Sequence, residues 1–116
     1  MTSAQELVRI AVDAAIEKKA IEPVVLDVSD LVKIVDWFII TSGANRRQVV
    51  TIVDEILDTT RFAGFRPLRK EGVDDAEWVL LDYGDVVVHV FLDETRRFYD
   101  LERLWADAPR THTAGG

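Results

Sequence analysis

The residues best suited to chemistry lie in one short stretch, "WVLLDYGDVVVHVF", which spans residues 78–91. This stretch combines His89 with Asp82 and Asp85, and an imidazole with nearby carboxylates can act in acid–base catalysis or hold a divalent metal ion. The chain has only two histidines and no cysteine, and no hydroxyl or thiol is placed to complete a nucleophile. We therefore favour a neutral His89 that packs on Trp78 and is hydrogen-bonded at one nitrogen.

A second candidate is "TSGANRRQ", residues 41–48, which predicts a turn from a strand into a helix with Gly43 at the bend. Backbone N–H groups at a helix start can bind an anion, but the stretch lacks the glycine spacing of a dinucleotide site and the lysine of a phosphate-binding loop. A helix start capped by Asn45 is the favoured interpretation. Arg46 and Arg47 either reach an anion or point into water.

The stretch 78–91 predicts two strands joined by a tight turn at Tyr83-Gly84, which places Asp82 opposite Asp85 and Trp78 opposite His89. Alternation then assigns each side chain to one of two faces. One face is plain core, formed by Val79, Leu81, Val86, Val88 and Val90. The other mixes apolar, aromatic and acidic groups, which suits a partner-binding surface better than an interior, and holds Trp78, Leu80, Asp82, Asp85, Val87, His89 and Phe91.

Negative charge is concentrated around this hairpin. The chain has a formal net charge of −7, and residues 71–102 contain ten acids against Arg96 and Arg97. The negative electrostatic field of these acids repels phosphate backbones and attracts basic proteins. The alternative, that these acids only solubilise an apolar segment, has equal weight.

Composition narrows the class of protein. With 116 residues, 48% of them hydrophobic, the chain has material for one core and predicts a single domain over residues 1–108, followed by a flexible tail over 109–116. The lack of cysteine fits a reducing compartment, so a cytoplasmic location is expected. No apolar run approaches the roughly 20 residues of a membrane span.

Periodicity predicts the elements that must position these groups. Helical spacing indicates a helix over about 4–20, and β-branched runs indicate strands near 23–28 and 35–42. Asn45 with Gln48 opens a second helix that ends at Gly64, and Asp100 caps a short last helix with an apolar stripe. The stripe of that last helix consists of Leu101, Leu104 and Trp105.

This order of elements predicts an α/β fold, with one mixed sheet of at least four strands and helices mainly on one face. The other face, which carries Trp78 and His89, is expected to be partly open.

Several segments together resemble the Iojap family, whose bacterial members are ribosomal silencing factors. They follow in collinear order from about Leu26 to Trp105, and they are "DWFIITSGANRRQV", "EG", "WVLLDYGDVVVHVF" and "RRFYDLERLW". The resemblance implies a nucleotidyltransferase-like fold without enzymatic activity, and therefore no catalytic residue, metal or cofactor. The sequence agrees, because no Asp-x-Asp or Asp-x-Glu pair for metal-assisted phosphoryl transfer follows Gly43 on a strand.

The resemblance also implies a partner and a mechanism. Family members bind the large ribosomal subunit through ribosomal protein fourteen, block joining of the small subunit and so repress translation when nutrients are short. A minor contact with ribosomal RNA is left open, as are the roles of Arg46, Arg47, Arg66, Arg69 and Lys70. A free homodimer is expected from the open apolar face and unpaired strand edges. The alternative function is a nucleotide-binding or nucleotidyltransferase enzyme.

The residues expected to contact the ribosomal protein all lie on the mixed face of the hairpin. Ribosomal proteins are basic because they bind RNA, so an acidic rim around an aromatic anchor suits such a partner. The expected contact residues are Trp78, Leu80, Asp82, Asp85, His89 and Phe91.

Overall fold

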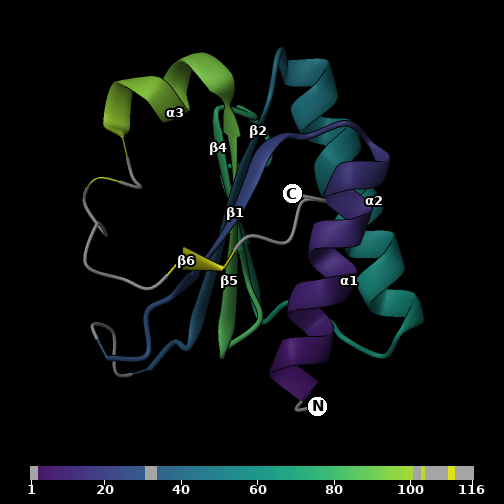
Figure 1. Ribbon diagram of the computed structural model, residues 1–116. Helices are drawn as coiled ribbons and strands as arrows, with labels where there is room; N and C mark the ends of the chain where they lie inside the picture. The colour runs from purple at the N-terminus through teal and green to yellow at the C-terminus, as the bar shows by residue number, and fades with distance from the viewer. Residues whose placement is uncertain (1–2, 31–33, 101–102, 104–109, 112–116) are drawn as a thin grey trace.

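A computed structural model describes residues 3–30, 34–100, 103 and 110–111 of the chain. Within these residues, six strands form one sheet in the order β3-β4-β5-β2-β1-β6, with α1 and α2 on one face and α3 on the other (Figure 1). The elements are α1 (Ser3–Glu17), β1 (Ile21–Asp27), β2 (Trp37–Gly43), α2 (Arg46–Phe62), β3 (Arg69–Glu71), β4 (Trp78–Asp82), β5 (Val86–Leu92), α3 (Asp93–Tyr99) and β6 (Arg110–Thr111).

The sheet is mixed because its central strands, β2 and β5, run parallel, whereas every other neighbouring pair is antiparallel. The predicted α/β fold with helices mainly on one face is confirmed. β3 and β6, the two outermost strands, were not predicted. β6 falls in the segment expected to be a flexible tail, where Arg110 and Thr111 pair with Leu26 and Val25 of β1; residues 112–116 lie outside the described part.

The larger core lies between the sheet and helices α1 and α2. Both helices turn an apolar stripe inward, as periods of three and four residues predict. Ala11 and Ala15 of α1 and Ile52 and Ile56 of α2 are fully buried there. From the sheet, side chains of four strands complete this core: Val25, Ile39, Val79, Leu81, Val86, Val88 and Val90.

A second apolar cluster lies on the opposite face of the sheet, and it corrects the expectation that this face is partly open. Leu26, Ile40 and Phe91 are each at most 1% exposed, and His89 is 5% exposed. The expectation was wrong because it placed no helix between β5 and Asp100, whereas α3 lies there, on this face of the sheet, and contacts β5 and β2 (Figure 1). The mixed face is therefore a second core with an accessible margin.

The end of β5 also differs from the sequence prediction. Asp93–Tyr99 form α3, and Asp100 ends that helix in a left-handed conformation with φ of 49°. The helix expected after Asp100 falls mainly outside the described residues, as do Leu101, Leu104 and Trp105. None of the described helices is long and apolar enough to cross a membrane.

Candidate functional site

The turn of the β4–β5 hairpin lies at Gly84-Asp85, one residue later than predicted. The Tyr83 amide donates to the Val86 carbonyl (2.9 Å), and Gly84 has a φ of 95°. The first residue of such a turn needs positive φ, which glycine adopts freely and tyrosine does not. The carboxylate of Asp82 fixes the turn by accepting from the Gly84 amide (2.8 Å).

This turn changes the pairing but preserves the faces. Trp78 lies opposite Phe91 and Leu80 opposite His89, so the predicted pairs of Trp78 with His89 and of Asp82 with Asp85 are wrong. Because the shift moves each partner by two positions, every strand residue keeps its predicted face. Asp85 is the exception, because it lies in the turn and is exposed.

Trp78 and His89 form a hydrogen-bonded pair at the centre of the mixed face. The indole N–H of Trp78 donates to His89 Nδ1 (3.1 Å), so the imidazole proton must be on Nε2. The His89 ring lies edge-on to Phe38, with centroids 4.9 Å apart. Burial lowers the pKa of His89 to about 4, so it is neutral at pH 7. The favoured interpretation of His89, a neutral side chain packed on Trp78, is confirmed.

His89 Nε2 is buried, and no described residue forms a hydrogen bond with it. In the described part of the chain, no group of three or more His, Cys, Asp or Glu side chains is arranged to hold a metal ion. The carboxylate of Asp82 is instead used by the Gly84 amide and by Arg69, 3.4 Å away. The structure therefore does not combine His89, Asp82 and Asp85 into one chemical centre.

Trp78 links the buried face to a more exposed group of aromatic side chains. Its ring centroid lies 4.9 Å from that of Phe91 and 5.3 Å from that of Tyr99. Tyr99 is 50% exposed, and the neighbouring Phe98 is 81% exposed. We call Trp78, Phe98 and Tyr99 the aromatic edge. Phe98 and Tyr99 were missed as site residues because α3, which presents them, has no apolar stripe that would reveal it.

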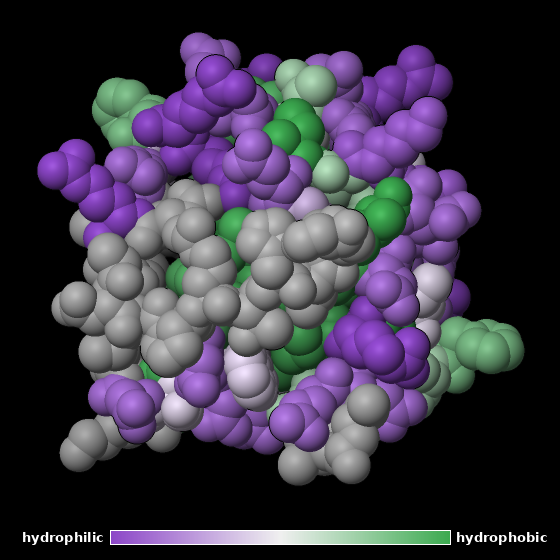
Figure 2. Space-filling view, in the orientation of Figure 1, coloured by the Kyte–Doolittle hydropathy of each residue, from purple (hydrophilic) through white to green (hydrophobic). Residues whose placement is uncertain are grey.

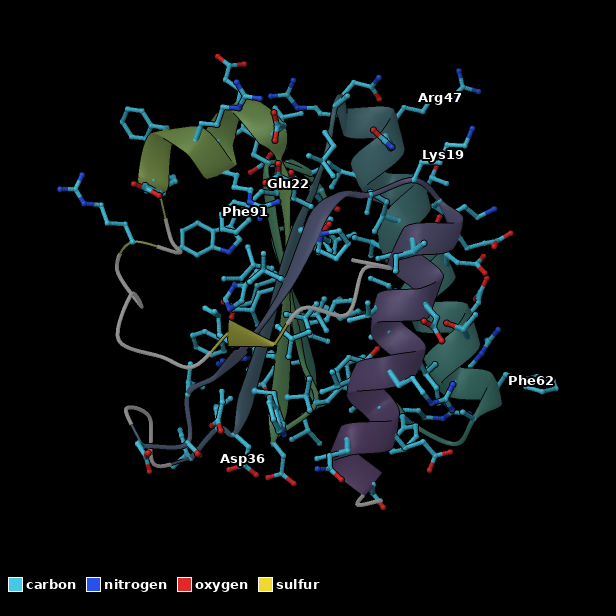
Figure 3. All side chains as sticks on the ribbon, in the orientation of Figure 1. Lys19, Glu22, Asp36, Arg47, Phe62 and Phe91 are labelled. Atoms are coloured by element: carbon cyan, nitrogen blue, oxygen red, sulfur yellow. The ribbon has the colours of Figure 1, made fainter. Side chains whose placement is uncertain are left out.

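The six expected contact residues differ in accessibility. Asp85 is exposed, Trp78, Leu80 and Asp82 are half-buried, and His89 and Phe91 are buried. Phe91 lies between the sheet and α3 (Figure 3). Only the first four can touch a partner in this conformation, while His89 and Phe91 hold Trp78 from behind.

A family model described as ribosomal silencing factor during starvation, RsfS, matches residues 1–115. The chain belongs to the RsfS family. A ribosomal silencing factor RsfS from Halalkalibacterium halodurans is 42% identical over 113 residues, which cover 97% of both chains. The crystal structure of a Chromobacterium violaceum protein superposes with a TM-score of 0.87 at 34% identity, covering 99% of this chain and 95% of that one.

Relatives from organelles extend the family and confirm the Iojap resemblance. The chloroplastic protein Iojap of Zea mays is 39% identical over 98 residues, covering 82% of this chain and 41% of its own. A mouse protein named for mitochondrial assembly of the ribosomal large subunit is 32% identical over 84 residues, covering 70% of this chain and 37% of its own. The RsfS domain is therefore one part of these longer proteins.

The second candidate site of this RsfS chain, the start of α2, is occupied by its own side chains. Asn45 accepts from the Gln48 amide (2.9 Å), and the side chain of Gln48 accepts from the Ala44 amide (2.7 Å). A Cβ at Gly43 would lie 2.9 Å from the Val49 nitrogen, so glycine is needed for close approach of strand and helix. The favoured interpretation, a capped helix start, is confirmed.

The two arginines at this helix start have different surroundings. Arg46 forms an ion pair with Glu77 and donates to the Asp75 carbonyl, so it ties α2 to the loop before β4. Arg47 is exposed and points away from the molecule (Figure 3). Arg46 thus has a structural role that the sequence did not reveal.

A buried arginine holds α3 in place. Arg96, 6% exposed, donates to the carbonyls of Ile21 and Glu22 (2.9 Å each) and to the Ser42 hydroxyl (3.2 Å). The Ser42 hydroxyl in turn donates to Asp93 (2.9 Å). This network fixes α3 against the ends of β1 and β2, and so it positions the aromatic edge.

Proposed function

We propose that this protein is a translation repressor that binds the large ribosomal subunit through ribosomal protein fourteen and sterically blocks joining of the small subunit. The observation that carries this proposal is the match of residues 1–115 to a family of ribosomal silencing factors. The name of the mouse relative supports the large subunit as the partner. The repression would operate in the cytoplasm when nutrients are short.

The geometry supports binding at the aromatic edge. Trp78 is half-buried and held by His89 and Phe91, so it can meet a partner with little loss of side-chain entropy. Figure 2 shows that hydrophilic residues cover most of the described surface in that view. Among the described residues, the aromatic side chains with a large exposed fraction are Phe98 and Tyr99 of the aromatic edge and Phe62 at the end of α2. Asp82 and Asp85 supply negative charge that suits a basic ribosomal protein.

Co-sedimentation with ribosomal particles tests the proposal. The wild-type protein should sediment with isolated large subunits but not with joined ribosomes, because the small subunit would occupy the same face. Added protein should also lower the fraction of joined ribosomes when both subunits are mixed. Equal binding to joined ribosomes would contradict steric occlusion, and no binding to large subunits would refute the proposed function.

The enzymatic alternative relies on the start of α2. There, Asn45 and Gln48 already accept from the amides that a nucleotide phosphate would need. Calorimetry with nucleoside triphosphates and Mg²⁺ separates the two functions, because binding tighter than roughly 10 µM, or about −7 kcal/mol, would favour the enzyme. We expect no such binding.

We also propose a homodimer for the free protein. Because the mixed face is covered, the dimer contact is expected at β3. This strand lies at the edge of the sheet, and its residues are all exposed. Light scattering should give twice the 13.1 kDa chain mass at high protein concentration. A monomer mass under those conditions would refute the dimer.

A further inference from the structure

The segment "RFAGFRPLRK", residues 61–70, has a charge opposite to that of the rest of the molecule. It contains four cations and no acid in a chain of net charge −7. It leads from the end of α2 into β3, and nearly all of it is exposed. We call Arg61, Arg66, Arg69 and Lys70 the basic corner.

Two cations of the basic corner have roles within the fold. Arg61 pairs with Asp58 (3.3 Å) in the last turn of α2, where a cation also interacts well with the helix dipole. Arg69 pairs with Glu71 and Asp82, at 3.4 Å each. Arg66 and Lys70 are exposed, and no carboxylate of the described residues forms a salt bridge with either. Their charge is available to a partner.

The two available cations line a shallow pocket between α2 and β3. Its volume is about 380 Å³, and it is lined by Leu57, Asp58, Arg61, Arg66, Pro67 and Lys70. Leu57 and Pro67 give it apolar walls, and Asp58, the only carboxylate among the described lining residues, is already paired with Arg61. This combination suits an anionic group attached to a less polar body, such as a phosphate on a sugar.

An exposed aromatic side chain lies at the end of α2, where the basic corner begins. Phe62 is 96% exposed and projects away from the molecule into solvent (Figure 3). Core packing does not explain a phenylalanine in this position. Aromatic side chains that accompany cations are typical of single-stranded nucleic-acid sites, because a base can stack on the ring while the cations contact the phosphates.

We propose that the basic corner binds the sugar–phosphate backbone of RNA, with Phe62 stacking on an unpaired base. That the RNA is ribosomal rests on the proposed function, which brings this protein to a particle rich in RNA. The acidic remainder of the chain repels other phosphates, so only a few contacts form and binding is strongly salt-dependent. A lipid surface fits less well, because membrane-binding segments present a broad apolar face rather than one projecting ring.

The test is fluorescence anisotropy of a fluorescein-labelled single-stranded RNA with the full chain at low salt, about 50 mM. The variant Arg66→Gln/Lys70→Gln should bind at least tenfold more weakly. Its plot of log K against log salt should be shallower by about 1.4, because two contacts to a single strand are lost. Phe62→Ala should weaken binding roughly fivefold or more at an unchanged slope.

The matched control is Lys19→Gln/Arg47→Gln, which removes the same two charge types from exposed positions near the start of α2. It should change RNA affinity less than about threefold, the size of a purely long-range charge effect. An equal loss in the control, no RNA binding by the wild type, or capture by phosphatidylglycerol vesicles in place of RNA would each overturn the proposal.

Trp78→Ala separates this inference from the proposed function. That variant should lose large-subunit binding and keep its affinity for the RNA probe. If the basic corner does not bind RNA, the ribosomal protein remains the proposed partner. If Trp78→Ala loses RNA binding, RNA and the ribosomal protein do not bind to two separate surfaces, and the inference is refuted.

Discussion

The two faces of the β4–β5 hairpin are built from the same strands but have different properties. Towards α1 and α2, the hairpin presents only valine and leucine side chains, each at most 1% exposed. On the other face, Trp78 donates a hydrogen bond to His89 within an apolar cluster, and its ring reaches the accessible aromatic edge. The first face supplies stability through close packing, whereas the second uses part of its packing to orient Trp78, the residue proposed to contact a partner.

The largest expected effect comes from a charge on the first face. Val88 is fully buried opposite Ile39 and Leu81, so Val88→Asp should cost more than about 4 kcal/mol and abolish cooperative unfolding. Val50→Asp is the control, because Val50 is 42% exposed on α2. Thermal unfolding followed by circular dichroism should show a near-normal transition for the control only. A normal transition in Val88→Asp would mean that the faces are wrongly assigned.

Removing the anchor of the second face should affect binding more than folding. Trp78→Ala should weaken binding to large subunits by about 2–4 kcal/mol, a factor of roughly thirty to a thousand. Trp78→Phe, which keeps a ring next to Phe91 and Tyr99, should lose much less. Both variants should still unfold cooperatively. If Trp78→Ala binds normally, or melts as badly as Val88→Asp, the ribosome must be met by another surface.

The buried imidazole should make stability depend on pH. The pKa of His89 is about 4 in the folded chain and about 6.5 when unfolded, so between these values the unfolded chain takes up the extra proton. The neutral His89 therefore contributes to the free energy of unfolding in full above pH 6.5, and this contribution is lost as the pH falls towards 4. Its total is on the order of 3 kcal/mol. Denaturant unfolding of the wild type and of His89→Gln across this pH range should show this loss of stability in the wild type only. The contributions of all other titrating groups are the same in both proteins and cancel in the comparison. Parallel pH profiles would contradict a buried neutral His89.

The smallest effects are expected at the turn. Asp85→Lys changes an exposed residue, so it should slow association with large subunits a few-fold and weaken its dependence on salt without changing the melting temperature. Asp82→Lys should also destabilise the fold by about 1 kcal/mol, because it removes the acceptor of the Gly84 amide. Stopped-flow binding together with melting distinguishes the two. Equal destabilisation would mean that Asp82 does not fix the turn.

Hydrophobic periodicity was enough to locate the helices and strands whose buried apolar residues recur at regular spacing. It predicted α1, α2 and the four central strands. The neutral His89 beside Trp78 was predicted instead from the lack of the partner groups that a catalytic or metal site would need. It could not predict β3, whose three residues are all charged and exposed, so its place in the sheet depends only on backbone pairing with β4.

Other features were missed because they depend on backbone geometry. The turn at Gly84-Asp85 follows from which residue tolerates positive φ, a difference of one position that the apolar pattern does not record. The buried Arg96 is stabilised by carbonyls at an irregularity of β1, where Glu22 has a φ of 41°. The burial of the mixed face likewise required α3 to be placed in three dimensions.

The parallel pairing of β2 with β5 has a consequence for biosynthesis. These central strands are separated in sequence by α2, β3 and β4, so the middle of the sheet closes only when Leu92 has left the ribosomal tunnel. Trp78 is synthesised before Phe91 and Tyr99, the two rings that it packs against. An unfinished chain therefore lacks an assembled aromatic edge, and the surface proposed for partner binding is complete only after Tyr99 has been made.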